Sequence, residues 1–303
     1  YWELDYRGEV VNSKKHVYAQ AFAIYALCAY HRLTGSEDAL FKALALYERI
    51  EVSALDSENG GYHEAFSRSW SEVRDVALSA GEPNYPKTMN THLHLFEAYT
   101  ALYAVHPREN IRFSLKGLLE CFVGNIINSE THHLRIYFDD AWRDRSTVYS
   151  YGHDIECSWL LWESAQAIGD EQLLSSLTPV ILDMVNACLD CRGENGEIPD
   201  GYNLKEHKRI EARPWWAQAE ALVGFLNAYT MTGDMRYFQA FESVWVFIKK
   251  YQRDWERGEW FWYSLLDGKK SPYKMGFWKA PYHNGRAMLE VCRRLRQVKC
   301  RAN

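Results

Sequence analysis

The sequence predicts an all-α fold in which helical hairpins pack side by side and close into an α/α barrel. Three observations support this prediction: apolar residues recur at helical spacing, glycine-containing turns separate pairs of helical segments, and Gly-rich aromatic passages follow each second segment. The same hairpins could also stack as an open solenoid. We favour the barrel, because closure would gather the long loops and the histidines at helix starts around one mouth.

Each repeating unit is expected to contain a first helix, a tight turn, a second helix and a long loop. In the first unit, apolar positions predict helices over residues 15–34 and 37–51, separated by a Gly-Ser turn. The first helix of each unit approaches its end at an alanine, namely Ala29, Ala98, Ala165 and Ala228. This near-regular recurrence is typical of an array of helical hairpins.

The last hairpin and the loops complete the expected architecture. The fourth hairpin ends with a helix over residues 235–251, and one further helix begins near Pro281. Four Gly-rich or aromatic passages are expected to form loops or short hairpins at one mouth, namely residues 59–62, 133–138, 195–198 and 258–263. We therefore expect about four hairpins and roughly nine helices.

Composition limits the class of protein. The chain has 303 residues, 47% of them hydrophobic and 15% aromatic, with twelve Trp and twenty Tyr. Such aromatic enrichment suggests ring-lined, partly wet surfaces of the kind that carbohydrates occupy. The net charge of −5 argues against nucleic acid as a partner, and no apolar stretch approaches the ~18 residues of a membrane span. Seven cysteines, an odd number, predict free thiols, which agrees with a cytoplasmic location. We also expect a monomer with no membrane partner.

A histidine among aromatic residues stands near the C-terminus. His283 follows Trp278 and Pro281, and the proline favours a helix start at this point. An imidazole that titrates near neutrality beside an aromatic ring suits proton transfer on a sugar. The alternative is an ordinary helix N-terminus with a solvated histidine.

A second candidate segment lies at the start of the third predicted first helix of a hairpin. His153 and Glu156 are three residues apart, so on a helix the carboxylate can orient the imidazole and raise its basicity. A buried structural pair is the alternative. Further along the chain, Trp215 and Trp216 precede Glu220, and a ring with a carboxylate one turn away makes a plausible sugar subsite. A plain core tryptophan is the alternative for this segment.

Another histidine lies in the second hairpin. Asn90, His94 and Glu97 fall on one face of the predicted helix, whereas His92 points elsewhere. The His-x-His spacing suits a metal site on a strand better than one on a helix, so we expect no metal here.

Five segments together resemble the cellobiose 2-epimerases of the N-acylglucosamine 2-epimerase superfamily. The segments are residues 15–27, 89–94, 150–156, 215–220 and 278–286. The resemblance implies an (α/α)6 barrel and reversible epimerisation at C2 of the reducing-end sugar of β-1,4-linked disaccharides. The implied substrates are of the cellobiose, lactose or mannobiose type, with cellobiose converted into glucosyl-mannose and lactose into epilactose. The resemblance further implies that the reaction needs neither a metal nor another cofactor.

The resemblance also implies roles for single residues. His153 and His283 would form the acid/base pair that handles the C2 proton, Glu156 would orient His153, and His94 would support ring opening. Substrate contacts are implied for Tyr18, Asn90, Trp216 and Trp278. Removal of a proton next to a carbonyl needs a base and donors that stabilise the enediolate, which agrees with these roles.

One departure from the family concerns the start of the chain. Complete family members carry about a hundred residues before the point that Tyr1 matches, so we expect the chain to hold roughly nine of the twelve helices of an (α/α)6 barrel. The expected domain is thus a single barrel over residues 1–303 that lacks N-terminal helices. We expect weak or no turnover until that segment is supplied.

Other functions remain open at this point. A glycosidase or a polysaccharide lyase on the same barrel would use opposed carboxylates or another base set, which three histidines at helix starts fit poorly. A non-catalytic sugar-binding fragment is a second alternative. Within the superfamily, a monosaccharide isomerase or an N-acylglucosamine 2-epimerase is the nearest competitor.

Overall fold

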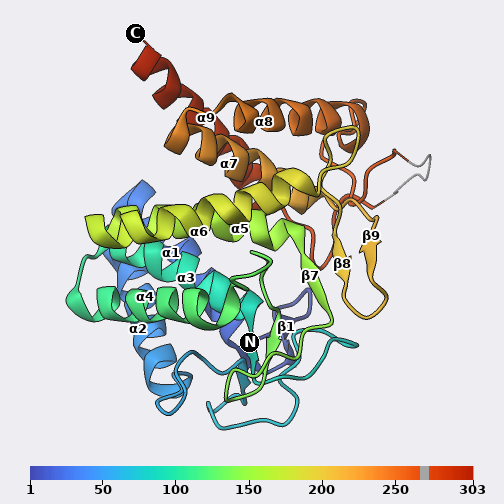
Figure 1. Ribbon diagram of the computed structural model, residues 1–303. Helices are drawn as coiled ribbons and strands as arrows, with labels where there is room; N and C mark the ends of the chain where they lie inside the picture. The colour runs from blue at the N-terminus through green and yellow to red at the C-terminus, as the bar shows by residue number, and fades with distance from the viewer. Residues whose placement is uncertain (267–272, 303) are drawn as a thin grey trace. The chain divides into compact units, whose positions relative to one another are not determined.

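A computed structural model describes residues 1–266 and 273–302 (Figure 1). The chain divides into two compact units. The first contains Tyr1–Asn128, Arg135–Ser146 and Glu163–Asp170, and the second contains Ser129–Leu134, Thr147–Trp162 and Glu171–Asn303. The single catalytic domain expected from the sequence stays a prediction.

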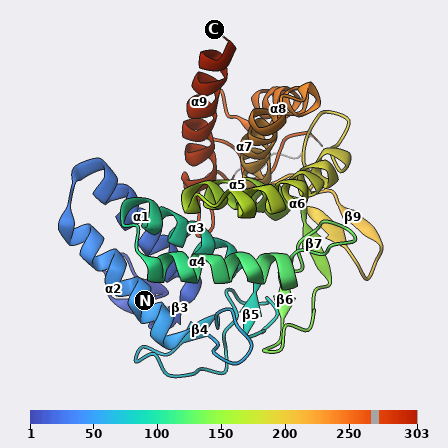
Figure 2. The same cartoon turned by 60° about the vertical axis from the view of Figure 1, so that its left-hand side comes forward.

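The first unit is built from two helical hairpins. Its helices are α1 (Val17–Thr34), α2 (Glu37–Ser53), α3 (Met89–Val105) and α4 (Glu109–Cys121), and α4 continues into the π-helical turn η1 (Phe122–Ile126). α1 lies beside both α2 and α3 (Figures 1 and 2). Gly35, with φ of 73°, ends α1 in the left-handed conformation, and Ser36 caps α2, so the predicted Gly-Ser turn is confirmed.

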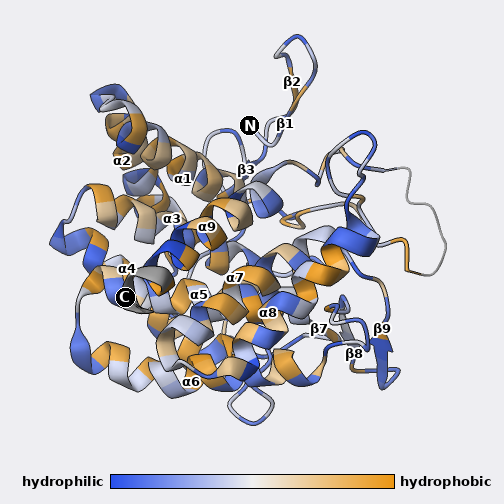
Figure 3. Ribbon diagram, turned by 90° about the horizontal axis from the view of Figure 1, so that it is seen from above, coloured by the Kyte–Doolittle hydropathy of each residue, from blue (hydrophilic) through white to orange (hydrophobic). Residues whose placement is uncertain are grey.

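The second unit repeats this arrangement. Its elements are α5 (Tyr151–Ile168, whose last six residues belong to the first unit), α6 (Glu171–Asp190), α7 (Trp215–Thr232), α8 (Met235–Phe247), the π-helical turn η2 (Ile248–Gln252) and α9 (Tyr282–Ala302). α7 packs against α8 and α9. α7 is apolar on nearly all sides and its middle is buried throughout, whereas α9 carries many charged residues (Figure 3).

Short antiparallel strands tie each long loop to a helix start. β3 (Lys15–His16) pairs with β4 (Ala65–Phe66), β5 (Lys87–Thr88) with β6 (Tyr137–Phe138), and β7 (Val148–Ser150) with β8 (Gly201–Asn203), which also pairs with β9 (Lys208–Ile210). β1 (Glu3–Leu4) pairs with β2 (Val10–Asn12). Since β3, β5 and β7 directly precede α1, α3 and α5, each hairpin's loop returns to the start of its own first helix.

The prediction of roughly nine helices is confirmed, because the described residues form nine α-helices. Two boundaries were wrong. Residues 15–16 form β3 and not the first turn of a helix, and the helix expected over residues 235–251 gives way to a π-helical turn after Phe247. Strand pairing and hydrogen-bond shifts of this kind are not encoded in apolar periodicity.

One described helix, α6, is long and apolar enough to cross a membrane by length and composition. The expectation that no apolar stretch approaches a membrane span was wrong for α6. That expectation was based on uninterrupted apolar runs, whereas α6 qualifies by its mean hydropathy. The buried side chains of α6 form one stripe made of Leu177, Ile181, Met184, Val185 and Cys188, as in a helix that packs on a protein core. A single such helix is weak evidence for a membrane, and the cytoplasmic location stays a prediction.

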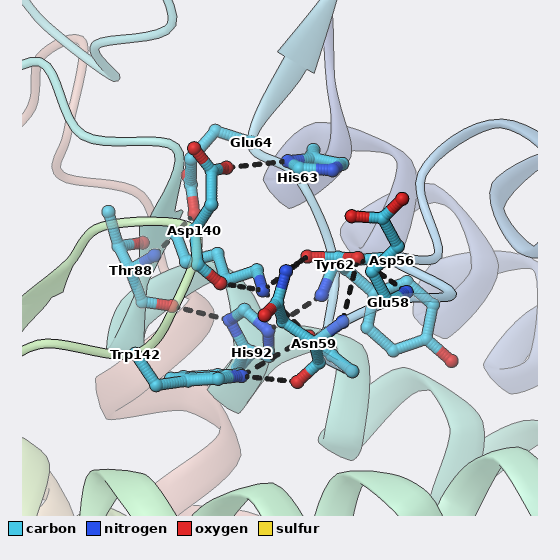
Figure 4. Close-up of polar contacts among 12 residues, drawn as sticks. Asp56, Glu58, Asn59, Tyr62, His63, Glu64, Thr88, His92, Asp140 and Trp142 are labelled. Atoms are coloured by element: carbon cyan, nitrogen blue, oxygen red, sulfur yellow. Dashed lines mark hydrogen bonds and ion pairs between the residues drawn. The ribbon is translucent and has the colours of Figure 1, made fainter.

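A buried lysine closes the loop after α2 in the first unit. Lys87 Nζ donates to Asp56 Oδ2 at 2.7 Å, to the carbonyl oxygen of Gly60 at 2.8 Å and to that of Asp140 at 2.8 Å (Figure 4). The indole ring of Trp142 lies 4.9 Å from the same ammonium. All three donor positions of the lysine are therefore used inside the protein.

The second unit contains a similar loop. Lys274 Nζ donates to Asp254 Oδ2 at 2.6 Å and to the carbonyl oxygen of Gly258 at 3.2 Å. The backbone of Gly258 donates to Asp254 as that of Gly60 does to Asp56. The recurrence of one loop design in both units agrees with the internal repeat that the sequence predicts.

Candidate active site

Three helices of the second unit bring the candidate residues together. His153 and Glu156 lie in the first turns of α5, Trp216 and Glu220 near the start of α7, and His283 near the start of α9. These helix starts are the ends to which the loops return. The sequence therefore predicted the correct ends of the helices.

His283 is held by a buried carboxylate. Its Nδ1 lies 2.7 Å from Glu220 Oε1, and Glu220 is fully buried. Burial acts to raise the pKa of Glu220, but the neighbouring Arg286 and His283 lower it below its usual value. An ionised carboxylate only accepts hydrogen bonds, so Nδ1 carries the proton and Nε2 is the nitrogen suited to act as a base.

Arg286 joins the two carboxylates of the cluster. Its Nη2 donates to Glu156 Oε1 at 2.6 Å and to Glu220 Oε1 at 2.7 Å. Glu156 Oε1 also lies 4.0 Å from His283 Nδ1. Glu156, expected to orient His153, thus also belongs to the surroundings of His283.

Both candidate acid/base histidines contact one aromatic ring. The imidazole of His153 lies 4.6 Å from the ring of Trp216, and that of His283 lies 5.5 Å from it, between ring centroids. Gly152 makes this possible, because a Cβ at that position would overlap the Trp216 ring. The structure therefore brings His153, Trp216 and His283 together within one unit.

The family resemblance implies that Trp216 contacts a sugar, and on that expectation replacing Gly152 with alanine should displace Trp216 and weaken sugar binding about tenfold or more, since even one methylene is felt in a well-packed site. The measurement is the quenching of tryptophan fluorescence by cellobiose, the disaccharide that the resemblance implies. Gly285→Ala is the matched control, because its added Cβ would meet only Pro281 at an ordinary contact distance of 3.8 Å. Equal binding of cellobiose by the two variants would show that the close approach of Trp216 to Gly152 is not needed for sugar binding.

Glu220 and Trp215, two of the expected substrate contacts, are both buried in the structure. Both oxygens of Glu220 are engaged within the protein, since Trp159 Nε1 donates to Oε2 at 3.1 Å, and its side chain is fully buried. Trp215 is also buried and packs against Trp262. Glu220 therefore contacts His283 within the protein, and the substrate contacts expected for Glu220 and Trp215 stay predictions.

Trp278 is exposed, with 38% of its surface accessible, and the neighbouring ring of Phe277 is exposed as well. The adjacent Lys279 is buried and donates to Glu259 Oε1 at 2.8 Å, which also accepts from Asn284 at 2.7 Å. These bonds connect the segment carrying Trp278 to the first turn of α9. The implied role of Trp278 in stacking on a sugar stays a prediction.

The first unit holds the other candidate residues. His94 Nδ1 lies 3.2 Å from Glu97 Oε2, which confirms that the two share a helical face. The ring of His94 packs against those of Tyr18 at 5.0 Å and Phe22 at 4.5 Å. Asn90 lies one turn before His94 in α3. The implied contacts of Tyr18, Asn90 and His94 with a substrate stay predictions.

The structure explains His92 without a ligand. Its Nδ1 donates to the carbonyl oxygen of Thr88 at 2.7 Å, and its Nε2 accepts from the backbone N–H of Tyr62 at 2.9 Å. Burial lowers the pKa of His92 to about 4, so the ring is neutral. The hydrogen bonds of His92 therefore hold the backbone of the loop shown in Figure 4.

Glu156, Glu220 and His283 offer ligand atoms within 4.8 Å of one another, a spacing that could hold a metal ion. The guanidinium of Arg286 already contacts both carboxylates and compensates part of their charge. The expectation of a reaction without metal stays a prediction.

Sequence reasoning missed Arg286 and the burial of Glu220. A local signal for Arg286 exists, because it lies three residues after His283 and so shares a face of α9 with it. The spacing alone does not reveal which groups Arg286 contacts, because its carboxylate partners come from α5 and α7.

Comparison with known proteins supports the family resemblance found in the sequence. The family profile described as N-acylglucosamine 2-epimerase (GlcNAc 2-epimerase) matches residues 1–286. A cellobiose 2-epimerase from Bacteroides fragilis is 41% identical over 293 residues, which are 96% of this chain and 75% of that protein. One from Ruminococcus albus is 40% identical over 97% of this chain and 75% of that protein.

A solved structure of similar sequence extends the likeness to the fold. The cellobiose 2-epimerase from Bacillus thermoamylovorans B4167 is 36% identical, with a TM-score of 0.91 over 97% of this chain and 76% of that chain. The expected fold class, an all-α (α/α)6 barrel of helical hairpins, is confirmed by this match. The expectation that about the first hundred residues are lacking is not borne out by the comparisons. They give a match over 97% of this chain and 76% of that chain.

Proposed function

We propose, from the premise that the chain belongs to the N-acylglucosamine 2-epimerase family and is a carbohydrate epimerase, that its substrates are β-1,4-linked disaccharides. The proposed reaction is the reversible epimerisation at C2 of the reducing-end glucose, which converts cellobiose into glucosyl-mannose. Relatives named cellobiose 2-epimerase, at about 40% identity, support this substrate class. Lactose is proposed as a second substrate of the same kind.

The observation that carries the proposal is the pair of imidazoles on the Trp216 ring. Inversion at C2 needs one group that removes the proton and another that returns it from the opposite face, or an intermediate that turns. His153 and His283 are the groups of the second unit suited to this exchange, because imidazoles titrate near neutral pH. Either histidine can act first, since the reaction is reversible.

In the proposed mechanism, the sugar ring opens and exposes the aldehyde at C1. One imidazole takes the proton from C2, and the electron pair of the broken C–H bond forms the enediolate. The other histidine, which enters the step as the imidazolium, then gives its proton to C2 on the opposite face, which restores the aldehyde and yields the mannose epimer. Glu220 stabilises the imidazolium of His283 through the 2.7 Å contact with Nδ1.

The remaining roles follow the family resemblance. His94 is proposed to support ring opening, Tyr18 and Asn90 to hydrogen-bond the sugar, and Trp278 to stack on it. Aromatic rings suit the apolar C–H face of a pyranose, and the exposed ring of Trp278 is accessible to such a ligand.

The test is to incubate the protein with cellobiose in deuterium oxide and follow C2 by NMR. We expect loss of the C2 proton signal, incorporation of deuterium and appearance of the mannose-ended disaccharide, without new reducing ends. The label accumulates over hours, so even weak turnover is detected.

Other results would contradict the proposal. New reducing ends would indicate a glycosidase. Saturable binding of cellobiose without exchange at C2 would indicate a sugar-binding protein, and faster exchange of mannose or N-acetylglucosamine than of cellobiose would indicate a monosaccharide enzyme.

A further inference from the structure

Arg286 and His283 share one acceptor atom. Glu220 Oε1 lies 2.7 Å from His283 Nδ1 and 2.7 Å from Arg286 Nη2. The two donors come from the same face of α9, three residues apart, and the acceptor comes from α7. Any change in the charge or position of the arginine therefore acts directly on the partner of the imidazole.

The guanidinium of Arg286 is held on several sides. Its Nη1 donates to the hydroxyl of Tyr282 at 2.6 Å, and the rings of Tyr282 and Trp159 lie 4.3 and 4.8 Å from its central carbon. The residue is buried. This contact set fixes the orientation of the fork that meets Glu156 and Glu220.

The charges around His283 can be followed element by element. α5 contributes the carboxylate of Glu156, α7 that of Glu220, and α9 the guanidinium of Arg286 and the phenol of Tyr282. The nearby ammonium of Lys279 is paired with Glu259 and lies over Trp215, a ring that contacts His283. Among the described residues with printed contacts, two carboxylates face His283 directly, and the guanidinium of Arg286 compensates part of their charge.

We propose that Arg286 is a positioning residue that holds Glu156 and Glu220 and compensates one of their charges, so that His283 remains an unprotonated base at neutral pH. The proposal rests on the proposed function only in naming His283 as a base. Two uncompensated buried carboxylates beside an imidazole would favour the imidazolium, which cannot accept the C2 proton. The arginine therefore sets the lower pH limit of the reaction.

The experiment follows the titration of His283 by NMR of histidine-labelled protein, with the signal assigned from the spectrum of His283→Gln. The variants are Arg286→Gln, Arg286→Lys and the double variant Arg286→Gln/Glu156→Gln. Arg293→Gln is the matched control, because it removes a cation from the same helix at a half-exposed position paired with Glu290. Circular dichroism identifies variants that fold, and C2 exchange against pH provides the second readout.

We expect the pKa of His283 to rise by about one to three pH units in Arg286→Gln, the range typical of a charge within a few ångströms. The acidic limit of C2 exchange should move upward with it. Arg286→Lys keeps the charge, and the double variant removes one carboxylate. Each should return the pKa of His283 and the acidic limit of C2 exchange toward the values of the unchanged protein. Arg293→Gln should leave both unchanged.

Two results would overturn the proposal. One is an unchanged His283 titration in folded Arg286→Gln. The other is a shift that persists in both the lysine variant and the double variant, which indicates a purely structural disturbance. If the titration shifts as expected but the unchanged protein exchanges no C2 proton, the proposed function fails and the role of Arg286 stands.

Discussion

His283→Asn is expected to lower the rate of C2 proton exchange in cellobiose about 10²- to 10⁴-fold, the range that a general acid or base contributes. The asparagine amide can still donate to Glu220, which now accepts from His283 Nδ1, but it has no nitrogen that titrates near neutral pH. The variant therefore separates the support of the site from its proton transfer. The measurement is deuterium incorporation at C2 with cellobiose at saturating concentration.

His207→Asn serves as the control, because His207 is an exposed histidine in a turn of the same unit. It should exchange at the rate of the unchanged protein. Full activity of His283→Asn would remove His283 from the chemistry and leave His153 to act with a different partner. Unchanged binding of cellobiose in both variants, measured by tryptophan fluorescence, would confirm that only the chemical step is affected.

The second large effect is expected on stability. Lys87→Met should lower the free energy of unfolding by about 3–5 kcal/mol, the usual cost of breaking a buried ion pair by removing one partner. The change leaves the Asp56 carboxylate and the carbonyl groups of Gly60 and Asp140 without the donor that now serves all three (Figure 4). Urea denaturation followed by circular dichroism gives the free energy.

The effect should also depend on pH. Although burial acts to raise the pKa of Asp56, hydrogen bonds from Lys87 and two backbone amides hold it below its ordinary value of 3.8. A carboxyl with a lowered pKa contributes stability above its unfolded pKa and loses it as the pH falls through the folded pKa. The difference between the unchanged protein and Lys87→Met should therefore shrink as the pH falls below 3.8.

Lys42→Met is the matched control, since Lys42 pairs with Asp38 on an exposed helix surface. It should cost no more than about 0.5 kcal/mol. The double variant Lys87→Met/Asp56→Asn should be less destabilised than Lys87→Met alone, because no unpaired charge remains. Equal costs at Lys42 and Lys87 would show that the buried pair does not stabilise the loop.

Much of the fold could be predicted because its signals are local. Gly35 and Gly233 end α1 and α7 in the left-handed conformation, and Ser36 and Asp234 cap the helices that follow. These interactions span only a few residues. The strands could not be predicted in this way, since Lys15 pairs with Phe66 across a whole helical hairpin.

The candidate site was predicted in part. The histidines at helix starts and Trp216 follow from sequence spacing and family resemblance, and the structure places His153, Trp216 and His283 together. Spacing also showed that Trp216 and Glu220 share a face of α7. It could not show that Glu220 is buried there, because that depends on Trp159 and Arg286 from two other helices.

The sequence by itself determined the helical hairpins, the ends of the helices that carry the candidate residues and the kind of side chain available there. Only the tertiary structure decided which of these side chains meet, namely that α9 presents His283 and Arg286 to one oxygen of Glu220 while Glu156 approaches from α5. The physical reason is that helix propensity and capping act within a few residues, whereas the charge and protonation of a buried group depend on neighbours that packing brings from distant parts of the chain.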